Sequence, residues 1–248
     1  MTCSPSWCPK MPDAPALELA DLVGGYQDSE VVHEVSVTVP RGSVVVLLGP
    51  NGAGKTTSLR LASGLLRPRS GRILMDGIDV TRMSPHARAE LGLCHIPEGR
   101  AIFPSLTVRE NILLHAPRGS ERRILDAAVD AFPAMREKLR ARASTLSGGQ
   151  QQMLALVPAF VTSPSVVLVD EPSLGLAPVL VDAIFELLGR LAARGVAMLV
   201  VEQYVKRALA MADTAYVLNR GRVELSGSPS QLAGSSLLAS YLGGGQSV

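Results

Sequence analysis

The stretch SVVVLLGPNGAGKTT, residues 43–57, joins an apolar run to a glycine-rich turn. Ser43 to Leu48 has the continuous aliphatic character of a strand that is buried on both faces, which is typical of a parallel sheet. Residues 49–56 fit the phosphate-loop pattern, and we expect a helix from Lys55 to about Ser63. A strand, a glycine turn and a helix in this order predict an α/β fold with an anion site at the helix N-terminus.

Each residue type in this loop has a chemical role. Glycines let backbone N–H groups turn inward around an anion, Lys55 would place its charge against the β- and γ-phosphates, and the Thr56 hydroxyl would bind Mg²⁺. A glycine-rich turn that merely contains a lysine is the alternative, and the flanking strand and helix argue against it. The predicted nucleotide-binding residues of the loop are Gly49, Pro50, Asn51, Gly52, Ala53, Gly54, Lys55, Thr56 and Thr57.

A second apolar run, VVLVDEP at residues 166–172, ends in two carboxylates. The carboxyl ends of parallel strands meet at one crevice, and ligands bind there. We therefore expect Asp170 to hold Mg²⁺, directly or through water, and Glu171 to orient or deprotonate the attacking water. The alternative is a strand that simply ends in an acidic turn, and it would be the better interpretation if the chain had no phosphate loop.

Composition limits the class of protein. A chain of 248 residues is long enough for one core with an inserted subdomain, and 47% apolar with only 4% aromatic residues suits aliphatic strands. The net charge of +2 gives no argument for nucleic acid as a partner, and the basic run Arg136–Arg142 is expected to be a solvated helix face. Three cysteines without a CxxC pair fit a reducing compartment, and no apolar run reaches the roughly 18 residues of a membrane span.

Strand and helix patterns divide the chain into parts. We predict a disordered leader at residues 1–15, a core at 16–98 and 164–248, and a helical insertion at about 99–163. The predicted strands are Val31–Val39, Ser43–Leu48, Leu93–Ile96, Val166–Val169 and Val196–Val201, with a hairpin of Arg72–Met75 and Ile78–Val80. The predicted helices beyond the phosphate loop are Thr107–His115, Glu121–Phe132, one from about Gly148, and Pro178–Arg194.

The segment LSGGQ, residues 146–150, begins a predicted helix with Ser147 as its N-cap. Alone it is an ordinary capped helix start. Together with GPNGAGKTT and VVLVDEP, in this order and spacing, it resembles the ATP-binding-cassette ATPases over roughly Leu17 to Leu242. The resemblance implies an α/β P-loop NTPase (RecA-like) core with an antiparallel β subdomain and an inserted α-helical subdomain.

The resemblance also implies how ATP would be held. Two cassettes would face each other head to tail, with each ATP between one chain's phosphate loop and the signature of the other chain. Tyr26 matches the family's aromatic residue that stacks on adenine, although a tyrosine after two glycines is otherwise a loop residue. The signature residues that would contact ATP in trans are Ser147, Gly148, Gly149 and Gln150, with Ser147 and Gly149 at the γ-phosphate.

Five further segments resemble the second ATPase of branched-chain amino-acid importers. They are HIPEGRAIFPSLTVREN, LSGGQQQMLA, DEPSLGLAP, VEQYV and the terminal YLGG. Urea-type cassettes tend to have Gln at the position of Glu98 and EPTEG in place of EPSLG. The implied function is ATP hydrolysis at the cytoplasmic face of a membrane. The implied partners are permease subunits, a second cassette and, indirectly, an extracytoplasmic solute-binding protein. The helical insertion with Glu98 to Arg109 would transmit the motion, with Phe103 and Leu106 as contact candidates.

Three positions depart from the general cassette pattern, and a fourth, Pro158, departs from the importer subgroup itself. Glu98 replaces a Gln, and its carboxylate could still reach Mg²⁺ or a water. Gln203 replaces a His, so it could hydrogen-bond the γ-phosphate without titrating near neutral pH. Ala177 replaces an Asp. Pro158 replaces an Arg of the helix after the signature, and we expect a bend or early stop near Leu154 to Val157.

Three other readings stay open. An importer for urea, amides or other solutes would use the same motifs. A cassette that works on ribosomes or DNA usually carries tandem cassettes or a long coiled-coil insertion, and neither pattern is present. A regulatory cassette that binds ATP without hydrolysing it is disfavoured by the intact Lys55, Asp170 and Glu171.

Overall fold

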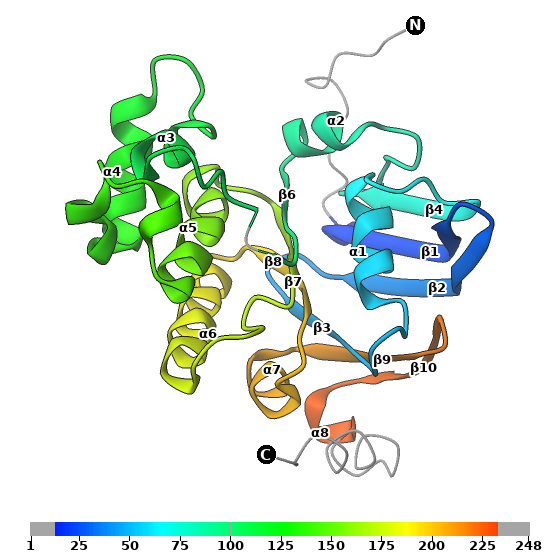
Figure 1. The fold of residues 1–248 in the computed structure, drawn as a ribbon. Helices are drawn as coiled ribbons and strands as arrows, with labels where there is room; N and C mark the ends of the chain where they lie inside the picture. The colour runs from blue at the N-terminus through cyan, green and yellow to red at the C-terminus, as the bar shows by residue number, and fades with distance from the viewer. Residues whose placement is uncertain (1–12, 100, 233–248) are drawn as a thin grey trace, which may run out of the picture.

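Two sheets organise the residues that the computed structural model describes, 13–99 and 101–232 (Figure 1). Residues 1–12 of the predicted leader and the terminal YLGG segment lie outside this range. The larger sheet has the strand order β10-β9-β3-β8-β7-β6, and β10 alone is antiparallel to its neighbour. Its strands are β3 (Val44–Leu48), β6 (Leu93–Ile96), β7 (Val166–Asp170), β8 (Ala197–Val201), β9 (Thr214–Asn219) and β10 (Arg222–Gly227).

A smaller antiparallel sheet is formed by two strands that precede β3 and by the predicted hairpin that follows the first helix. Its order is β2-β1-β4-β5. Its strands are β1 (Leu17–Tyr26), β2 (Ser29–Val39), β4 (Ser70–Met75) and β5 (Ile78–Asp79). The predicted hairpin of β4 and β5 is confirmed by the Leu74–Asp79 and Met75–Ile78 pairs.

The helices fall into two groups on either side of the larger sheet. Helices α3, α4, α5 and α6 lie together on the left in Figure 1, and α1 lies between the two sheets. Their bounds are α1 (Lys55–Ser63), α2 (Pro85–Glu90), α3 (Val108–Leu113), α4 (Glu121–Ala131), α5 (Gly148–Val161), α6 (Pro178–Ala192), α7 (Val205–Met211) and α8 (Pro229–Leu232), with 3-10 turns at Pro133–Lys138 and Ala143–Thr145.

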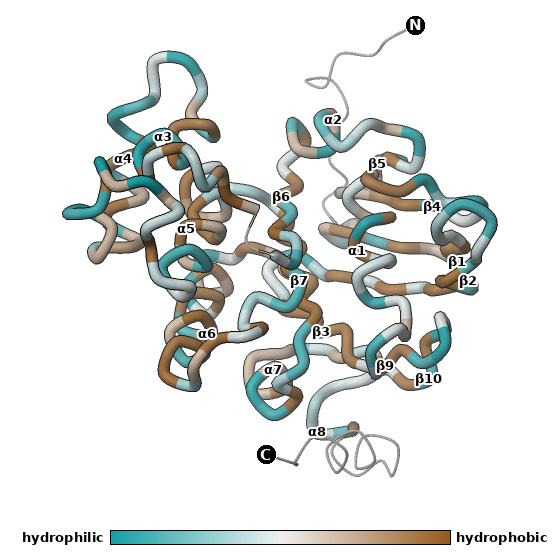
Figure 2. The backbone as a smooth tube through the Cα atoms, in the orientation of Figure 1, coloured by the Kyte–Doolittle hydropathy of each residue, from teal (hydrophilic) through white to brown (hydrophobic). Residues whose placement is uncertain are grey.

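Strand β3 shows why its sequence is continuously apolar. Val44, Val46 and Leu48 pack into the core beneath α5 and α6, whereas Val45 and Leu47 pack into the core beneath α1 and the antiparallel sheet. All five residues are buried. Figure 2 shows the hydrophobic strands running through the middle of the molecule. A strand covered on both faces needs apolar residues at every position rather than at alternate ones.

The fold class expected from the sequence is confirmed, and most predicted elements lie within three residues of their observed bounds. The sequence patterns predicted no separate elements for β1, α2, α7, α8, β9 and β10. Of the bend or early stop expected near Leu154 to Val157, the early stop is wrong, because α5 continues to Val161. Pro158 lies in the last turn, so the helix loses only the bond to the Leu154 carbonyl, and buried packing of this turn outweighs that loss.

None of the helices in the described part of the chain is long and apolar enough to span a bilayer.

Arg88 on α2 is almost fully buried, at 1% exposure, and it acts as a cap for another helix. Its guanidinium donates to the carbonyls of Leu61 (2.8 Å) and Ala62 (2.7 Å) in the last turn of α1, and to the Thr81 carbonyl (3.0 Å). Burial lowers the pKa of Arg88 to about 10, so the group stays charged at neutral pH. A cation beside the C-terminal carbonyls of a helix satisfies groups that have no partner within the helix.

Replacement of Arg88 by alanine should therefore destabilise the chain by about 3 kcal/mol, because two buried carbonyls and one half-buried carbonyl lose a charged donor. That corresponds to a fall of roughly 6 to 12 °C in the thermal midpoint for a chain of this size. The matched control is Arg122→Ala, since Arg122 is 96% exposed, and it should change stability by less than about 0.5 kcal/mol. Equal midpoints for the two variants would show that Arg88 does not hold α1 and α2 together.

Candidate functional site

A cavity of about 460 Å³ opens where the carboxyl ends of the parallel strands meet the start of α1. The three predicted catalytic residues and six of the nine predicted phosphate-loop residues border it. The lining residues are Val31, Asn51, Gly52, Gly54, Lys55, Thr56, Thr57, Glu98, Glu171, Leu174 and Gln203. The crevice beside the phosphate loop is therefore open space rather than filled by protein side chains.

The phosphate loop takes the backbone course that its glycines were expected to allow. At Gly49, φ is 148°, and a Cβ there would stand 2.1 Å from the Leu218 carbonyl oxygen, so only glycine fits. Lys55 is the first residue of α1 and is 4% exposed. Its Nζ donates to the carbonyls of Gly49 (2.8 Å) and Pro50 (3.0 Å), which ties the ammonium to its own loop.

The charges around Lys55 act on one another. Burial lowers the pKa of Lys55, and the nearby carboxylates of Glu171 and Asp170 oppose that effect. Burial, with a further contribution from the charges of Glu171 and Glu98, raises the pKa of Asp170 to about 6, against the hydrogen bond from Thr56 and the charge of Arg60. The site thus brings three carboxylates close enough to repel one another beside a single ammonium group.

Thr56 and Asp170, the two predicted metal ligands from distant segments, lie in contact. The Thr56 hydroxyl donates to Asp170 Oδ1 at 3.1 Å, although the residues are 114 positions apart. Hydroxyl and carboxylate oxygens are the hard donors that a magnesium ion prefers. The mutual repulsion of Asp170, Glu171 and Glu98 is a second feature that a divalent cation would relieve.

Glu171 and Gln203 are joined directly. Gln203 Nε2 donates to Glu171 Oε2 at 2.8 Å, so the residue in the usual histidine position holds the predicted base. Glu171 has a φ of 45°, in the left-handed region that a residue with a side chain rarely adopts. Its N–H donates to the Val201 carbonyl (2.9 Å), which keeps the strained turn at the end of β7 in place.

Sequence reasoning missed a buried pair behind these two residues. Glu202 is 2% exposed, and Ser173 is fully buried; the Ser173 hydroxyl donates to Glu202 Oε1. The Tyr204 N–H donates to the same oxygen at 3.2 Å, and Glu202 Oε2 has no partner among the described residues. Burial raises the pKa of Glu202. A glutamate directly after the apolar run of β8, and next to Gln203, is the sequence signal that could have found this pair.

Tyr26 and the signature segment lie away from the cavity lining. The Tyr26 hydroxyl accepts from Arg60 Nη1 at 2.9 Å, with the guanidinium carbon 5.8 Å from the ring centroid, and the ring is 39% exposed. Ser147 is confirmed as the N-cap of α5, and it forms a capping box with Gln150. Gly149 is buried, and a Cβ there would stand 2.6 Å from the Leu180 side chain, which gives this glycine a packing role.

Comparison with protein-family models identifies the family to which these residues belong. The model described as ABC transporter matches residues 32–174, more than half of the chain. The chain belongs to the ABC transporter ATPase family. It is an ATP-binding, ATP-hydrolysing cassette, and the resemblance drawn from its motifs is confirmed.

Several relatives of this cassette are similar along nearly the whole chain. The probable branched-chain amino acid transport ATP-binding protein LivF of Archaeoglobus fulgidus is 36% identical over 220 residues, 87% of this chain and 93% of the relative. The corresponding high-affinity protein BraG of Pseudomonas aeruginosa is 37% identical over 223 residues, 88% and 96% of the two chains. The lipopolysaccharide export protein LptB of Acidithiobacillus ferridurans is 34% identical over 235 residues, 92% and 96%. A solved ATP-binding subunit of an ABC transporter superposes with a TM-score of 0.79 at 30% identity, covering 92% and 98%.

The buried Ser173–Glu202 pair makes a prediction for the cassette. We expect Ser173→Ala to lower kcat by roughly tenfold, because loss of a hydrogen bond to a charged group, about 1.5 kcal/mol, would loosen the backbone that carries Gln203. The KM for ATP should change little, and Ser173→Thr should restore most of the rate. Steady-state phosphate release measures both constants.

Ser36→Ala is the matched control, because Ser36 donates to the Asp21 carboxylate at 2.8 Å on an exposed surface away from the cavity. It should leave kcat unchanged. If Ser173→Ala lost stability in urea but turned over ATP at the parental rate, the pair would be only a packing feature.

Proposed function

We propose that this cassette is the ATPase subunit of a membrane importer for branched-chain amino acids. The observation that carries the chemistry is the shared cavity of Lys55, Thr56, Glu171 and Gln203, with Asp170 bonded to Thr56. The similarity to LivF and BraG supports the solute class. We place the chain at the cytoplasmic face of the membrane, bound to permease subunits.

The residues around the cavity would have three roles in hydrolysis: phosphate binding, metal binding and proton transfer. The backbone N–H groups of Asn51 to Thr57 and the positive end of α1 would hold the phosphates, and Lys55 would turn from its own loop towards them. Thr56 and Asp170 would hold Mg²⁺, with Glu98 at the rim; the ion supplies positive charge against the β- and γ-phosphate oxygens. Glu171 would accept a proton from the attacking water while Gln203 orients its carboxylate.

A second cassette would complete the site. Within one chain the signature residues are not among those that line the cavity, so Ser147 and Gly149 could serve ATP only from a neighbouring molecule. Leu174 at the cavity rim is 45% exposed, and Val179 at the start of α6 is 80% exposed. Exposed apolar side chains beside a polar cavity are typical of a surface that a partner covers. Tyr26, with its ring exposed, would lie against the adenine.

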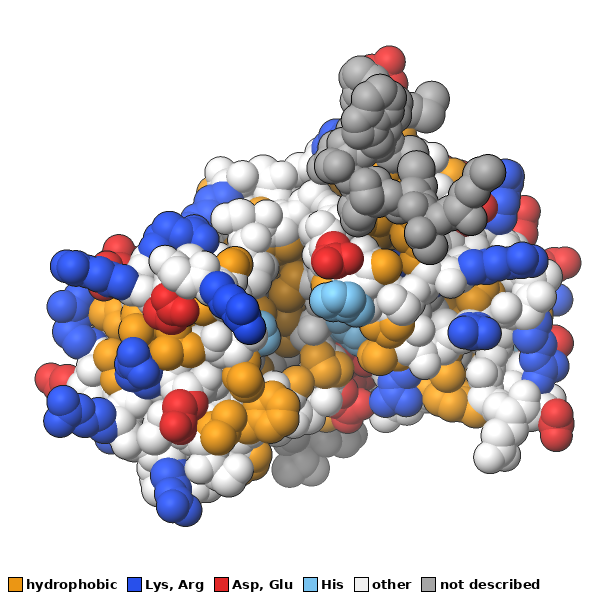
Figure 3. All heavy atoms as spheres, turned by 90° about the horizontal axis from the view of Figure 1, so that it is seen from above, with side chains coloured by type: hydrophobic (Ala, Val, Ile, Leu, Met, Phe, Trp, Pro, Cys, Tyr) orange, Lys and Arg blue, Asp and Glu red, His pale blue; other side chains and the backbone are white. Residues whose placement is uncertain are grey.

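The permease contact is assigned to a groove between α3, α5 and β6. This groove of about 340 Å³ includes Ile102, Phe103, Leu114 and His95 in its lining. Phe103 and Leu114 are 56% and 54% exposed, whereas Leu106 is half-buried. Burial lowers the pKa of His95 to about 4, and its buried Nε2 has no partner among the described residues. Figure 3 shows the upper face hollowed, with hydrophobic side chains along the hollow. An amphipathic helix of the permease fits this surface.

A specific observation favours a second candidate, an export system. The 34% identity to LptB extends over 92% of this chain, so the cassette motifs alone do not select import. Reconstitution with the membrane subunits encoded beside this chain would decide between the two. We expect a leucine-loaded binding protein to stimulate ATP hydrolysis in proteoliposomes. Stimulation by lipopolysaccharide alone would overturn import. Stimulation by a urea-loaded binding protein would change the proposed solute from branched-chain amino acids to urea.

The catalytic assignment predicts the behaviour of Glu171→Gln. General-base catalysis contributes about 10² to 10⁴-fold, so this variant should lose turnover by such a factor and still bind ATP. Bound, unhydrolysed ATP should then accumulate paired cassettes, which light scattering detects. A parental rate of phosphate release from Glu171→Gln would exclude Glu171 as the base.

The trans arrangement predicts a complementation experiment. Lys55→Ala removes the phosphate-loop cation, and Ser147→Arg blocks the signature, so each variant alone should be inactive. In a mixture, a head-to-tail pair contains one site built from the intact Lys55 of one copy and the intact Ser147 of the other. Turnover should therefore reappear only in the mixture. A mixture as inactive as its components would mean that both residues must act within the same chain.

A further inference from the structure

A second cavity lies beside the antiparallel sheet. It shares no lining residue with the nucleotide cavity. Its volume is about 890 Å³, and two segments line it: residues 67–72, which lead from α1 into β4, and residues 79–83, which lead from β5 to α2. Both segments contribute arginines to the same space. The lining residues are Arg67, Pro68, Arg69, Ser70, Gly71, Arg72, Asp79, Thr81, Arg82 and Met83.

The positive charge of this cavity is only partly neutralised by the protein. Arg69 is engaged, since it pairs with Glu30 (3.0 Å) and donates to the Gln27 carbonyl. Hydrogen bonds from Thr81 lower the pKa of Asp79, and the charges of Arg72 and Arg82 lower it further. Asp79 is thus ionised and faces two guanidinium groups.

Arg67 adds a third cation to Arg72 and Arg82. It is exposed, and among the described residues it forms no ion pair or hydrogen bond. Three arginines against one carboxylate leave an excess of positive charge over a concave surface. Guanidinium groups bind phosphate oxygens in a two-pronged geometry, so this excess favours a phosphate-bearing anion.

The surroundings of the cavity favour a lipid over a soluble phosphate. Met83 at its edge is 37% exposed, and Leu65, two residues before Arg67, is 57% exposed. Apolar side chains beside arginines suit the boundary between phospholipid headgroups and acyl chains. Inorganic phosphate or pyrophosphate would gain nothing from these apolar neighbours.

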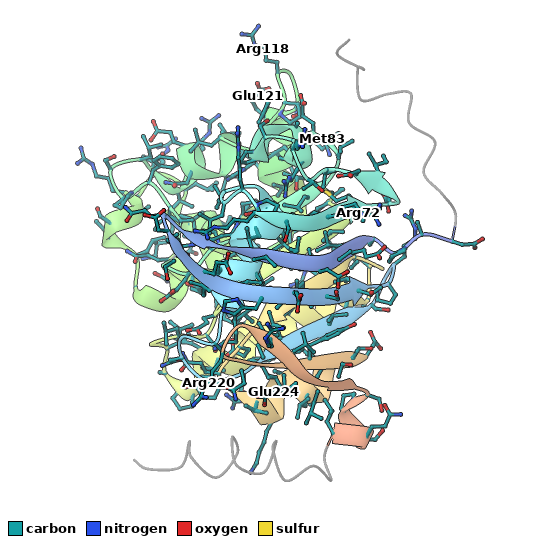
Figure 4. All side chains as sticks on the ribbon, turned by 90° about the vertical axis from the view of Figure 1, so that its right-hand side faces the viewer. Arg72, Met83, Arg118, Glu121, Arg220 and Glu224 are labelled. Carbon is teal, nitrogen blue, oxygen red and sulfur yellow. The ribbon has the colours of Figure 1, made fainter. Side chains whose placement is uncertain are left out.

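The position of the cavity agrees with a bilayer contact. Met83 directly precedes the Ser84 N-cap of α2, and Ala89 of the same short helix lines the groove assigned to the permease. Figure 4 shows Arg72 and Met83 in the upper half of the molecule, the half whose upper face is hollowed in Figure 3. If the permease occupies the groove, the arginines lie beside the plane of the membrane.

We propose that the cavity of Arg67, Arg72 and Arg82 binds the phosphate headgroups of anionic phospholipids and anchors this part of the cassette to the bilayer. The inference rests on the proposed membrane-facing orientation, but not on which solute is transported. It adds a direct lipid contact to the contact through the permease.

The test is co-sedimentation of the purified full chain with vesicles. Phosphatidylcholine vesicles are compared with an equal mixture of phosphatidylcholine and phosphatidylglycerol, each at low and high salt. Each basic residue near an anionic surface strengthens binding about fivefold, so Arg67→Glu with Arg82→Glu should weaken partition into the anionic vesicles by roughly thirtyfold or more. High salt should weaken the wild-type chain in the same direction.

The matched control is Arg136→Glu with Arg140→Glu, which makes the same charge change on the exposed basic segment of the helical part. Its partition should stay well above that of the cavity variant. Equal losses in both variants would mean diffuse attraction and overturn the site. Absence of binding to anionic vesicles by the wild-type chain would overturn it as well.

Two further measurements separate the possible failures. Calorimetry with pyrophosphate tests a soluble ligand; tight binding that needs Arg82, without vesicle binding, would overturn the lipid assignment. ATP hydrolysis by the cavity variant should equal that of the wild type, because none of these arginines lines the nucleotide cavity. Loss of vesicle binding with intact hydrolysis therefore supports the lipid site, whereas a wild-type chain that hydrolyses no ATP contradicts the proposed function alone.

Discussion

The hydrogen bond between Thr56 and Asp170 depends on the register of the parallel sheet. Val201 in β8 is level with Leu47 in β3 and also with Asp170 in β7, so the three strands end in one row. The phosphate loop, the Glu171 turn and Gln203 therefore emerge side by side at one edge. Displacement of β7 by one residue would exchange its two faces and turn Asp170 away from Thr56. The geometry of the candidate site is in this sense a property of the strand register.

That register is maintained by burial on both faces of the sheet. Odd and even residues of β3 enter different hydrophobic cores, one beneath the helices α5 and α6 and one beneath α1 and the antiparallel sheet. Loss of either cover would expose a row of aliphatic side chains, each of which contributes about 1.5 to 3 kcal/mol when buried. The two covers come from different parts of the chain, so the site requires the antiparallel sheet and the helical region to be folded together.

The local parts of this structure were readable from the sequence. The phosphate loop, the Ser147 cap and the β7 strand each follow from a few neighbouring residues whose chemistry permits little else. The hydrogen bond from Gln203 to Glu171 and the Ser173–Glu202 pair join residues about 30 positions apart, and no local pattern specifies them. Pro158 failed as a helix-stop signal for the same reason, because packing around α5 decided the outcome. Strands β9 and β10 carry mixed polar and apolar residues, so their patterns were too weak to predict them.

The same edge of the sheet also carries several of the energetic costs of the fold. Lys55, Asp170 and Glu202 are buried ionisable groups, Glu171 has a left-handed backbone, and Glu202 Oε2 lacks a partner among the described residues. Buried Arg88, by comparison, has three carbonyl partners for its two Nη groups, although its Nε has none among the described residues. Strain and crowded charge persist only where the surrounding structure enforces them. A triphosphate with its cation would supply Lys55 with an anion and the carboxylates with a positive charge, so the binding of substrate would relieve a cost that the folded chain already carries.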